Sequence, residues 1–221
     1  MLLKSITIPK SIQRNLSGNK FSMFSKYKIF IEKYIPYNFV EWTLFKSKLK
    51  VERFKKGETI LHIGDTSTSL RFINSGLARA YMITENGKDY TWSIFFNDKN
   101  SHMVNLFVID YDSFLNQTPS QLNIEAIEDC ELFLLNYKDV QFLYDKLKKG
   151  ERFGRLMSQE AYSYLHNQTI DRQTKTAQER FDDFMKKTPF LLEKVPQYQI
   201  ASLLDITPQY LSQLKRKHIK N

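Results

Sequence analysis

The sequence of 221 residues holds one cysteine, few histidines and no long apolar run. A single thiol, Cys130, excludes an intramolecular disulfide and an iron–sulfur cluster that needs several thiolates. We interpret Cys130 as a small buried strand residue, and a redox switch is the alternative. No apolar run approaches the ~20 residues that span a bilayer. The first residues also lack the apolar core of a secretory signal, so the sequence favours a cytoplasmic protein without a membrane segment.

Acidic residues are fewer than basic ones. Lysine and arginine number 33 against 24 aspartates and glutamates, which leaves a formal net charge of +9. Such an excess suggests an anionic partner, most often nucleic acid. A lysine-rich composition inherited from an AT-rich genome is the alternative. The aromatic share of 14% argues against disorder, and the length suits one large domain or two modest ones.

The pattern of residues changes several times along the chain. Residues 1–22 carry basic side chains and no acid, which predicts a loose arm. Residues 24–49 have apolar positions three to four apart and predict two short helices. From 53 to 137 the period is two, and short strands separated by glycine turns predict a β-sandwich or barrel. The turn glycines are Gly57, Gly64, Gly76 and Gly87.

One predicted strand, "DYTWSIFF", alternates most clearly. A period of two places successive side chains on opposite faces of a sheet. One expected face carries Tyr90, Trp92, Ile94 and Phe96, and the other carries Asp89, Thr91 and Ser93. We expect Trp92 to lie in the core, as we do for Trp42.

A β-barrel can also carry a metal-dependent enzyme of the cupin kind, which needs closely spaced histidines on strands. The histidines of this chain are scattered, at His62, His102, His166 and His218. No glycine-rich nucleotide loop and no serine–histidine–aspartate signature accompanies them. We therefore predict no catalytic residue, no metal site and no enzymatic activity.

Helical spacing returns after the strands and is longest over residues 150–170. An apolar stripe follows this helix and consists of Phe153, Leu156, Met157, Ala161, Tyr164 and Leu165. Such a stripe can pack on its own domain or, as in a coiled coil, on a second copy of the chain. The pattern alone leaves both interpretations open.

The last segment, residues 171–221, ends in the pattern of a helix-turn-helix. Two helices that cross steeply need a small residue at their contact, and Ala201 occupies that position. The apolar core positions are filled by Ile200, Leu204, Ile206, Leu211 and Leu214. Thr207 is a suitable N-cap and Pro208 a suitable first residue of the second helix. Asp205 stands in the turn, where aspartate tolerates the left-handed conformation better than most residues.

The outer face of the second helix predicts contact with DNA. Gln209 and Gln213 carry the amide that pairs with adenine in the major groove, so we expect them to read bases. Tyr210 and Ser212 are secondary candidates. The expected phosphate contacts are Thr207, Lys215, Arg216 and Lys217. The alternative is a C-terminal helical hairpin with a solvated charged face.

Three stretches carry a family resemblance: "KGETILHIGDTSTSLRFINSGLARAY", "TAQERFDDFM" and "VPQYQIASLLDITPQYLSQLKRK". They resemble the Crp/Fnr family of bacterial transcription regulators, in the branch common in Bacteroidetes. The resemblance implies an α+β fold. A cyclic-nucleotide-binding-like β-roll (jelly roll) with flanking helices would cover residues 23–149. A long dimerisation helix (150–170) and a C-terminal helix-turn-helix domain (171–221) would follow. It also implies a homodimer on near-palindromic double-stranded DNA, with RNA polymerase as a further candidate partner.

The ligand site departs from the family's pattern. Members that bind cyclic AMP hold its phosphate with a glycine–glutamate pair and an arginine beside a small residue. The matching region, residues 105–126, has no glycine, and the arginine position falls on Ser120 or Gln121. No lysine or arginine occurs from Asn100 to Tyr137. A buried phosphate would lack compensation there, so we expect no cyclic nucleotide and predict no cofactor.

The sequence thus predicts a homodimeric, sequence-specific DNA-binding transcriptional regulator. Its β-roll would sense an unidentified small-molecule effector or none. A ligand-sensing or protein-interaction module with a vestigial helix-turn-helix is the alternative.

Overall fold

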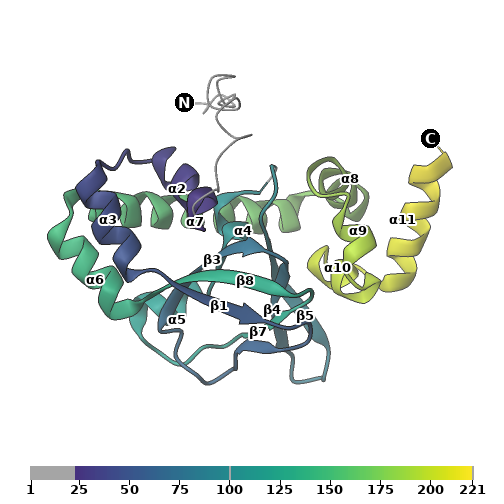
Figure 1. Ribbon diagram of the computed structural model, residues 1–221. Helices are drawn as coiled ribbons and strands as arrows, with labels where there is room; N and C mark the ends of the chain where they lie inside the picture. The colour runs from purple at the N-terminus through teal and green to yellow at the C-terminus, as the bar shows by residue number, and fades with distance from the viewer. Residues whose placement is uncertain (1–22, 100, 221) are drawn as a thin grey trace.

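The computed structural model describes residues 23–99 and 101–220, so the predicted arm over 1–22 lies outside the described residues. A strand-rich body is flanked by helices on one side and followed by a helical C-terminal part (Figure 1). The strands are β1 (Lys50–Phe54), β2 (Thr59–Leu61), β3 (Ser69–Ser75), β4 (Leu77–Ile83), β5 (Asp89–Phe96), β6 (Phe107–Val108), β7 (Asn123–Ala126) and β8 (Cys130–Asn136).

The helices fall into two groups along the chain. Those before the last strand are α2 (Ser25–Glu32), α3 (Phe39–Lys48), α4 (Met103–Leu106) and α5 (Tyr111–Asn116). Those after it are α6 (Tyr137–Lys146), α7 (Lys148–Thr174), α8 (Ala177–Lys187), α9 (Leu191–Lys194), α10 (Gln197–Leu203) and α11 (Pro208–Lys220). The two short helices expected over 24–49 are confirmed as α2 and α3. The long helix expected over 150–170 is α7, which extends a little further at each end.

The strands form two antiparallel four-stranded sheets, ordered β1-β8-β3-β6 and β2-β7-β4-β5. Alternate side chains of both sheets point inward and meet in one core, to which Ile73, Phe95 and Leu132 contribute. The predicted α+β fold with a β-roll is therefore confirmed. This two-sheet body is called the roll below.

Glycine turns join the strands where the sequence predicts them. Gly57, Gly64, Gly76 and Gly87 all have positive φ angles, which a side chain disfavours. At Gly76, with φ of 96°, space adds a second constraint. A Cβ there would overlap the backbone of Asp129 and Cys130. The turn between β3 and β4 therefore requires glycine on both counts.

The expected alternation of β5 is wrong at its centre. Ser93 pairs with Ala80, but Thr91 rather than Trp92 pairs with Tyr81, so Trp92 is the extra residue of a β-bulge. Because paired residues share a face, Thr91 joins Ile94 on the outer face of the sheet. Trp92 leaves the expected core position and is 37% exposed. A bulge depends on the partner strand, and a period-two pattern within one strand does not contain that information.

The outer face of the β4–β5 ladder carries the C-terminal helices. Leu77, Ile94 and Phe96 of these strands lie in one apolar core with Phe181 of α8 and Ile200 of α10. The remaining face of the roll is covered by α2, α3, α6 and α7, whose side chains meet Phe72, Phe107 and Phe133 in a second, aromatic-rich core.

Candidate nucleic-acid interface and ligand cavity

The helix-turn-helix is formed by α10 and α11. Leu211 and Leu214 of α11 are fully buried against Ile200 and Ala201 of α10. Leu204 completes the buried set, and Ile206 packs at its edge. All six apolar or small positions expected from the sequence therefore lie in this core. A well-packed core holds α11 at a defined angle to α10.

The turn between these helices has the predicted chemistry. Asp205 adopts the left-handed conformation with φ of 54°. The N–H of Tyr210 donates to Thr207 Oγ1 at 3.2 Å, so Thr207 is the N-cap of α11 as expected. Pro208 is the first residue of the helix. Proline lacks the N–H that would be unsatisfied at this position.

Arg180 of α8 binds this turn, and the sequence analysis did not single it out. Its Nε donates to Leu204 O at 3.1 Å, and its Nη2 donates to Asp205 O at 3.4 Å. A third donor, Nη1, reaches Lys175 O at 2.7 Å. The first two bonds satisfy carbonyls at the end of α10, and the third satisfies one at the end of α7. The sequence shows an arginine within "TAQERFDDFM", but the carbonyls that it binds in the turn lie 24 and 25 residues later in the chain.

The predicted DNA-contacting residues lie together on α11 and its N-cap. Thr207, Gln209, Tyr210, Gln213, Arg216 and Lys217 are exposed, and Ser212 and Lys215 are half-buried. Ser212 Oγ donates to Pro208 O at 3.0 Å, so its hydroxyl already has a partner within the helix. No acidic residue occurs on α11. The arrangement presents amides near the start of the helix and cations nearer its end, and the assignment of these residues to DNA stays a prediction.

Part of the stripe predicted as a dimer interface faces its own chain. Phe153 and Met157 belong to the core between α7 and the flanking helices. Ala161 is buried and lines a cavity of the roll. These three side chains are therefore packed within their own chain, because one face of α7 lies against the roll and its flanking helices.

The rest of the predicted stripe is more accessible. Leu165 is 39% exposed at the rim of the cavity, and Leu156 is half-buried. Tyr164 is half-buried and stacks on His102, with ring centroids 5.0 Å apart. Tyr162, which the sequence analysis omitted, is 71% exposed. It lies three residues before Leu165, so both side chains are on one face of the helix. The dimer interface stays a prediction. The exposed apolar surface of α7 includes Tyr162 and Leu165 and so coincides only in part with the predicted stripe.

A cavity of about 280 Å³ lies between the roll and α7. Met82, Trp92, Phe95, Ile109 and Leu122 contribute apolar walls. None of the described side chains that line it is a lysine or an arginine. The lining therefore has the scarcity of cations that the sequence predicts for this region.

Carboxylates occupy the polar side of this cavity. Asp110 is the N-cap of α5: its Oδ1 accepts from Ser113 N–H at 3.4 Å, and its Oδ2 accepts from Ser120 Oγ at 2.7 Å. Asp112 follows in the first turn of the same helix. Ser120 is thus buried and engaged in structure, whereas Gln121 is exposed at the rim of the cavity.

Tyr111 lines the cavity, but its hydroxyl belongs to the aromatic-rich core. The hydroxyl is buried without a hydrogen bond among the described residues, and its charged form would be near Tyr144 and Tyr27. Burial raises the pKa of Tyr111, so the phenol stays protonated. The apolar walls and the two carboxylates of the cavity fit a neutral or cationic ligand better than an anion.

Cys130 is buried at the start of β8, as expected. Its Sγ lies 3.2 Å from Leu77 O and 3.2 Å from Glu128 O. Burial raises the pKa of the Cys130 thiol to about 11. The reactive thiolate is therefore scarce at neutral pH, which disfavours the alternative of a redox switch.

A comparison with protein-family models finds a match over the roll. Residues 51–147 match the family model described as the cyclic nucleotide-binding domain. None of the curated proteins matches the chain significantly. The matched residues span the strands of the roll and α6, so this part of the chain is similar to a cyclic nucleotide-binding domain. No helix in the described part of the chain is long and apolar enough to cross a membrane.

Solved structures extend the comparison to the whole fold. FixK2 from Bradyrhizobium japonicum has a TM-score of 0.62 at 16% identity, over 78% of this chain and 85% of that chain. A variant of CooA from Carboxydothermus hydrogenoformans has a TM-score of 0.59 at 16% identity, over 86% and 83%. CLP from Xanthomonas campestris, a c-di-GMP-responsive global regulator, has a TM-score of 0.57 at 14% identity, over 83% and 92%.

These neighbours are Crp/Fnr family transcriptional regulators. The chain therefore combines a cyclic nucleotide-binding domain with the fold of the Crp/Fnr regulators. The resemblance expected from the sequence is confirmed.

Proposed function

We propose that this protein is a sequence-specific DNA-binding transcriptional regulator that acts as a homodimer in the cytoplasm. A Crp/Fnr-like fold with a cyclic nucleotide-binding domain suggests transcription regulation. One observation carries the proposal further: α11 is held by a packed helix-turn-helix core and presents an exposed outer face without an acid. Such a face suits the major groove of DNA, where the N-terminal part of a recognition helix meets base edges.

The residues of α11 divide into two roles. Gln209 and Gln213 would read bases, because an amide can bond both to N6 and to N7 of adenine. Arg216 and Lys217 would bind phosphates, because their charge and their place in the second half of the helix suit the backbone of the duplex. Tyr210, Ser212, Lys215 and the Thr207 N-cap are the remaining candidates.

The homodimer would form along α7, within the proposed segment 150–170 between a sensor part (23–149) and a DNA-binding part (171–221). Tyr162 and Leu165 supply exposed apolar surface on one face of that helix. Leu156 would border it, and Tyr164, whose ring stacks on His102, would lie at its edge. Two copies joined there would place two recognition helices in successive major grooves about 34 Å apart. RNA polymerase is a further proposed partner at the promoter.

The effector of the roll would not be cyclic AMP bound in the usual way. The N–H groups at the start of α5 are the natural donors for a phosphate, but Asp110 already accepts there. Asp112 adds a second negative charge nearby, and no described lysine or arginine lines the cavity. A neutral or cationic effector is consistent with this lining, because a buried phosphate would stay uncompensated.

The test is a selection of binding sites from random double-stranded DNA with the purified full chain. Recovery of an inverted repeat with half-sites about one helical turn apart is the expected result. Recovery of no sequence, together with binding that is insensitive to salt, would favour the second candidate, a sensor or interaction module with a vestigial helix-turn-helix. Repeating the selection with a metabolite extract separates a missing effector from this second candidate.

A further inference from the structure

The described part of the chain buries two charged side chains, and only one of them has a counter-ion. Arg79 of β4 is 3% exposed and forms ion pairs with Asp89 at 2.7 Å and with Glu125 at 2.6 Å. Asp110, at the start of α5, is 8% exposed and forms no ion pair with any described residue. A carboxylate that leaves water without a counter-ion loses hydration that hydrogen bonds restore only in part. The roll therefore compensates its buried cation but not its buried anion.

The N-cap role of Asp110 does not require its charge. Two other helices, α3 and α6, are capped by Asn38 and Asn136, whose Oδ1 atoms accept at 2.9 and 2.8 Å. The corresponding bond to Asp110, from Ser113 N–H, is 3.4 Å long, which exceeds the roughly 2.7–3.2 Å that is usual. A neutral asparagine would thus suffice for the cap, and the negative charge at this position has no local structural reason.

The carboxylate of Asp110 belongs to the lining of the cavity between the roll and α7, and so does that of Asp112. Asp112 is exposed, and its Oδ1 accepts from Asn116 Nδ2 at 2.8 Å, so it has no counter-ion among the described residues either. Trp92 and Tyr164 contribute aromatic rings to the same lining. The faces of such rings attract cations. One cavity therefore combines two uncompensated carboxylates with aromatic and apolar walls.

One cation stands close to this lining without belonging to it. The guanidinium carbon of Arg172 lies 5.9 Å from the ring centroid of Trp92 and 5.7 Å from that of Tyr90. Arg172 lines the separate groove where α7 meets α8, and it forms no ion pair with Asp110. The aromatic rings of this region thus already attract a cation, while the charge inside the cavity stays uncompensated by the described residues.

We propose that this cavity binds a small organic cation, a primary ammonium on an aromatic or apolar body, and that Asp110 is its counter-ion. At about 280 Å³ the cavity lies at the lower end of protein ligand pockets, which begin at roughly 300 Å³, so the ligand is small. The ammonium would donate to Asp110, its body would lie against the apolar walls, and Asp112 would attract it from the rim. The inference rests on the proposed function for the sensing role of the roll, but the binding itself is measured without DNA.

The first experiment is titration calorimetry of the full wild-type chain with three matched probes. The probes 2-phenylethylammonium, 2-phenylethanol and 3-phenylpropanoate share a phenylethyl body and differ in the charge of the polar end. The ammonium should bind about ten- to a hundredfold more tightly than the alcohol, because hydrogen bonds to a charged group are the stronger ones. The propanoate should bind most weakly. Equal or tighter binding of the alcohol or the propanoate would overturn the proposal, as would no saturable binding of the ammonium up to about 10 mM.

A variant that keeps the cap assigns the preference to one carboxylate. Asp110→Asn removes the charge and leaves an oxygen for the N–H of Ser113. Ser120 Oγ, which donates to Asp110, lies 3.0 Å from Leu122 O and can donate there instead. Affinity for the ammonium should fall about ten- to a hundredfold, to that of the alcohol. Asp145→Asn, at an exposed position of α6, is the charge-matched control and should bind as the wild-type chain does. Retained preference in Asp110→Asn, or its loss in the control, would contradict the counter-ion.

Thermal unfolding without a ligand separates a counter-ion from a carboxylate that the fold needs. Asp110→Asn should leave the unfolding midpoint unchanged or raise it, because it removes an uncompensated buried charge and keeps the cap. Asp110→Ala, which also removes the cap, should lower the midpoint. A lower midpoint in Asp110→Asn would assign the charge to the stability of α5 and would count against the proposal.

Trp92 reports where the probe binds. The chain has two tryptophans, so Trp42→Phe leaves Trp92, which lines the cavity, as the sole emitter. Its fluorescence should change with added 2-phenylethylammonium and saturate at the calorimetric affinity. Saturable binding without a change of emission would place the probe elsewhere and refute the site. A DNA selection that recovers no sequence would contradict the proposed function and leave these results unaffected.

Discussion

The cavity segment of the roll and the last helix carry opposite kinds of charge. From Asn100 to Tyr137 the chain has no lysine or arginine, whereas α11 has no acid. Both regions are candidate binding sites, and both place polar groups at the start of a helix. At the start of α5 the carboxylate of Asp110 caps the helix and is buried. At the start of α11 the neutral hydroxyl of Thr207 caps the helix, and this residue is exposed.

This difference indicates where an anion can bind. A helix N-terminus favours negative charge, and a carboxylate that already caps it removes that advantage. The net positive charge of the sequence therefore does not indicate an anion site in the roll's cavity. It indicates one on α11, whose cationic outer face is held in a fixed direction by the packed helix-turn-helix core. Four predictions test the comparison, from the largest expected effect to the smallest.

Removal of the core under α11 should have the largest effect. Leu211 is fully buried, so Leu211→Ala should lower the free energy of unfolding by about 2–5 kcal/mol. DNA binding should fall on every sequence, because the outer face loses its fixed direction. Chemical denaturation measures the first effect. Leu115→Ala, at a position that is 53% exposed, is the control and should change stability by less than about 1 kcal/mol.

Loss of a base-reading amide should have an intermediate, position-specific effect. Gln213→Ala should cost about 1–3 kcal/mol of binding at one base position of the selected site and relax the preference there. Binding to a panel of single-base variants of the site measures this. An equal loss on all members of the panel would contradict the base-reading role and assign Gln213 to the backbone.

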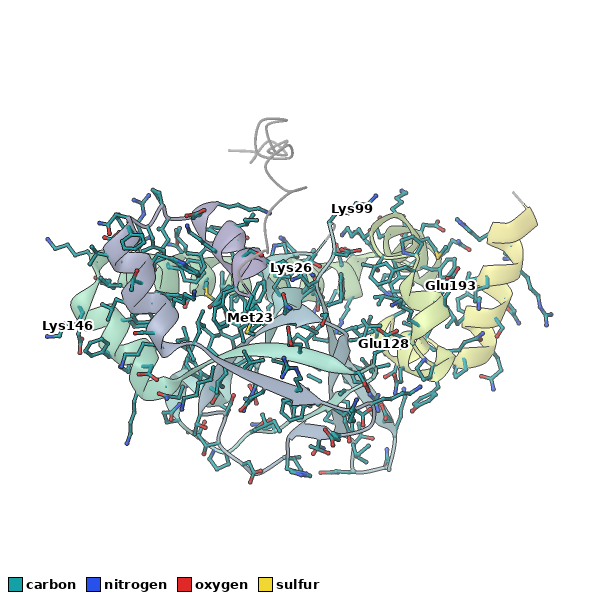
Figure 2. All side chains as sticks on the ribbon, in the orientation of Figure 1. Met23, Lys26, Lys99, Glu128, Lys146 and Glu193 are labelled. Atoms are coloured by element: carbon teal, nitrogen blue, oxygen red, sulfur yellow. The ribbon has the colours of Figure 1, made fainter. Side chains whose placement is uncertain are left out.

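Loss of a phosphate contact should be smaller and independent of sequence. Arg216→Ala should weaken binding to all duplexes by about 1 kcal/mol and reduce the slope of log affinity against log salt by about 0.9. Lys146→Ala is the matched control, because Lys146 lies on α6 at the end of the molecule away from α11 (Figure 2). A change of slope in the control, or none in Arg216→Ala, would contradict the placement of the anion site.

The smallest effect is expected from cyclic AMP. Titration calorimetry of the wild-type chain should give a dissociation constant above about 1 mM, because Asp110 and Asp112 meet the phosphate instead of a cation. The double variant Asp112→Asn, Gln121→Arg should bind more tightly, since it removes one negative charge and adds a cation at the rim. Micromolar binding of cyclic AMP by the wild-type chain would contradict the conclusion that an anion binds at α11 but not in the roll's cavity.

Local patterns predicted a large part of this structure. The helix-turn-helix core was readable because its six positions lie within fifteen residues and obey a single helical geometry. The turn glycines were readable because positive φ restricts the residue type at one position. Thr207 and Pro208 marked the start of α11 for the same local reason.

Contacts between distant segments were not readable. The bulge at Trp92 depends on the register of β5 against β4, and it reversed the expected face of Thr91. The stripe on α7 was visible, but which of its side chains face the roll depends on how the whole helix docks. Ser202 looked like one more polar residue of α10, and its partners on β5 lie 111 and 113 residues earlier.

The sequence by itself thus determined the element types, the turn positions, the helix-turn-helix and the opposite charges of its two candidate sites. Each follows from conformational preference or charge within a short stretch of chain. The tertiary structure alone decided that α10 docks on the outer face of β5 and that one strand separates the cavity from the DNA-binding part. The physical reason is that burial and edge pairing depend on which surfaces pack together. One local sequence pattern is compatible with several such packings, so it does not decide between them.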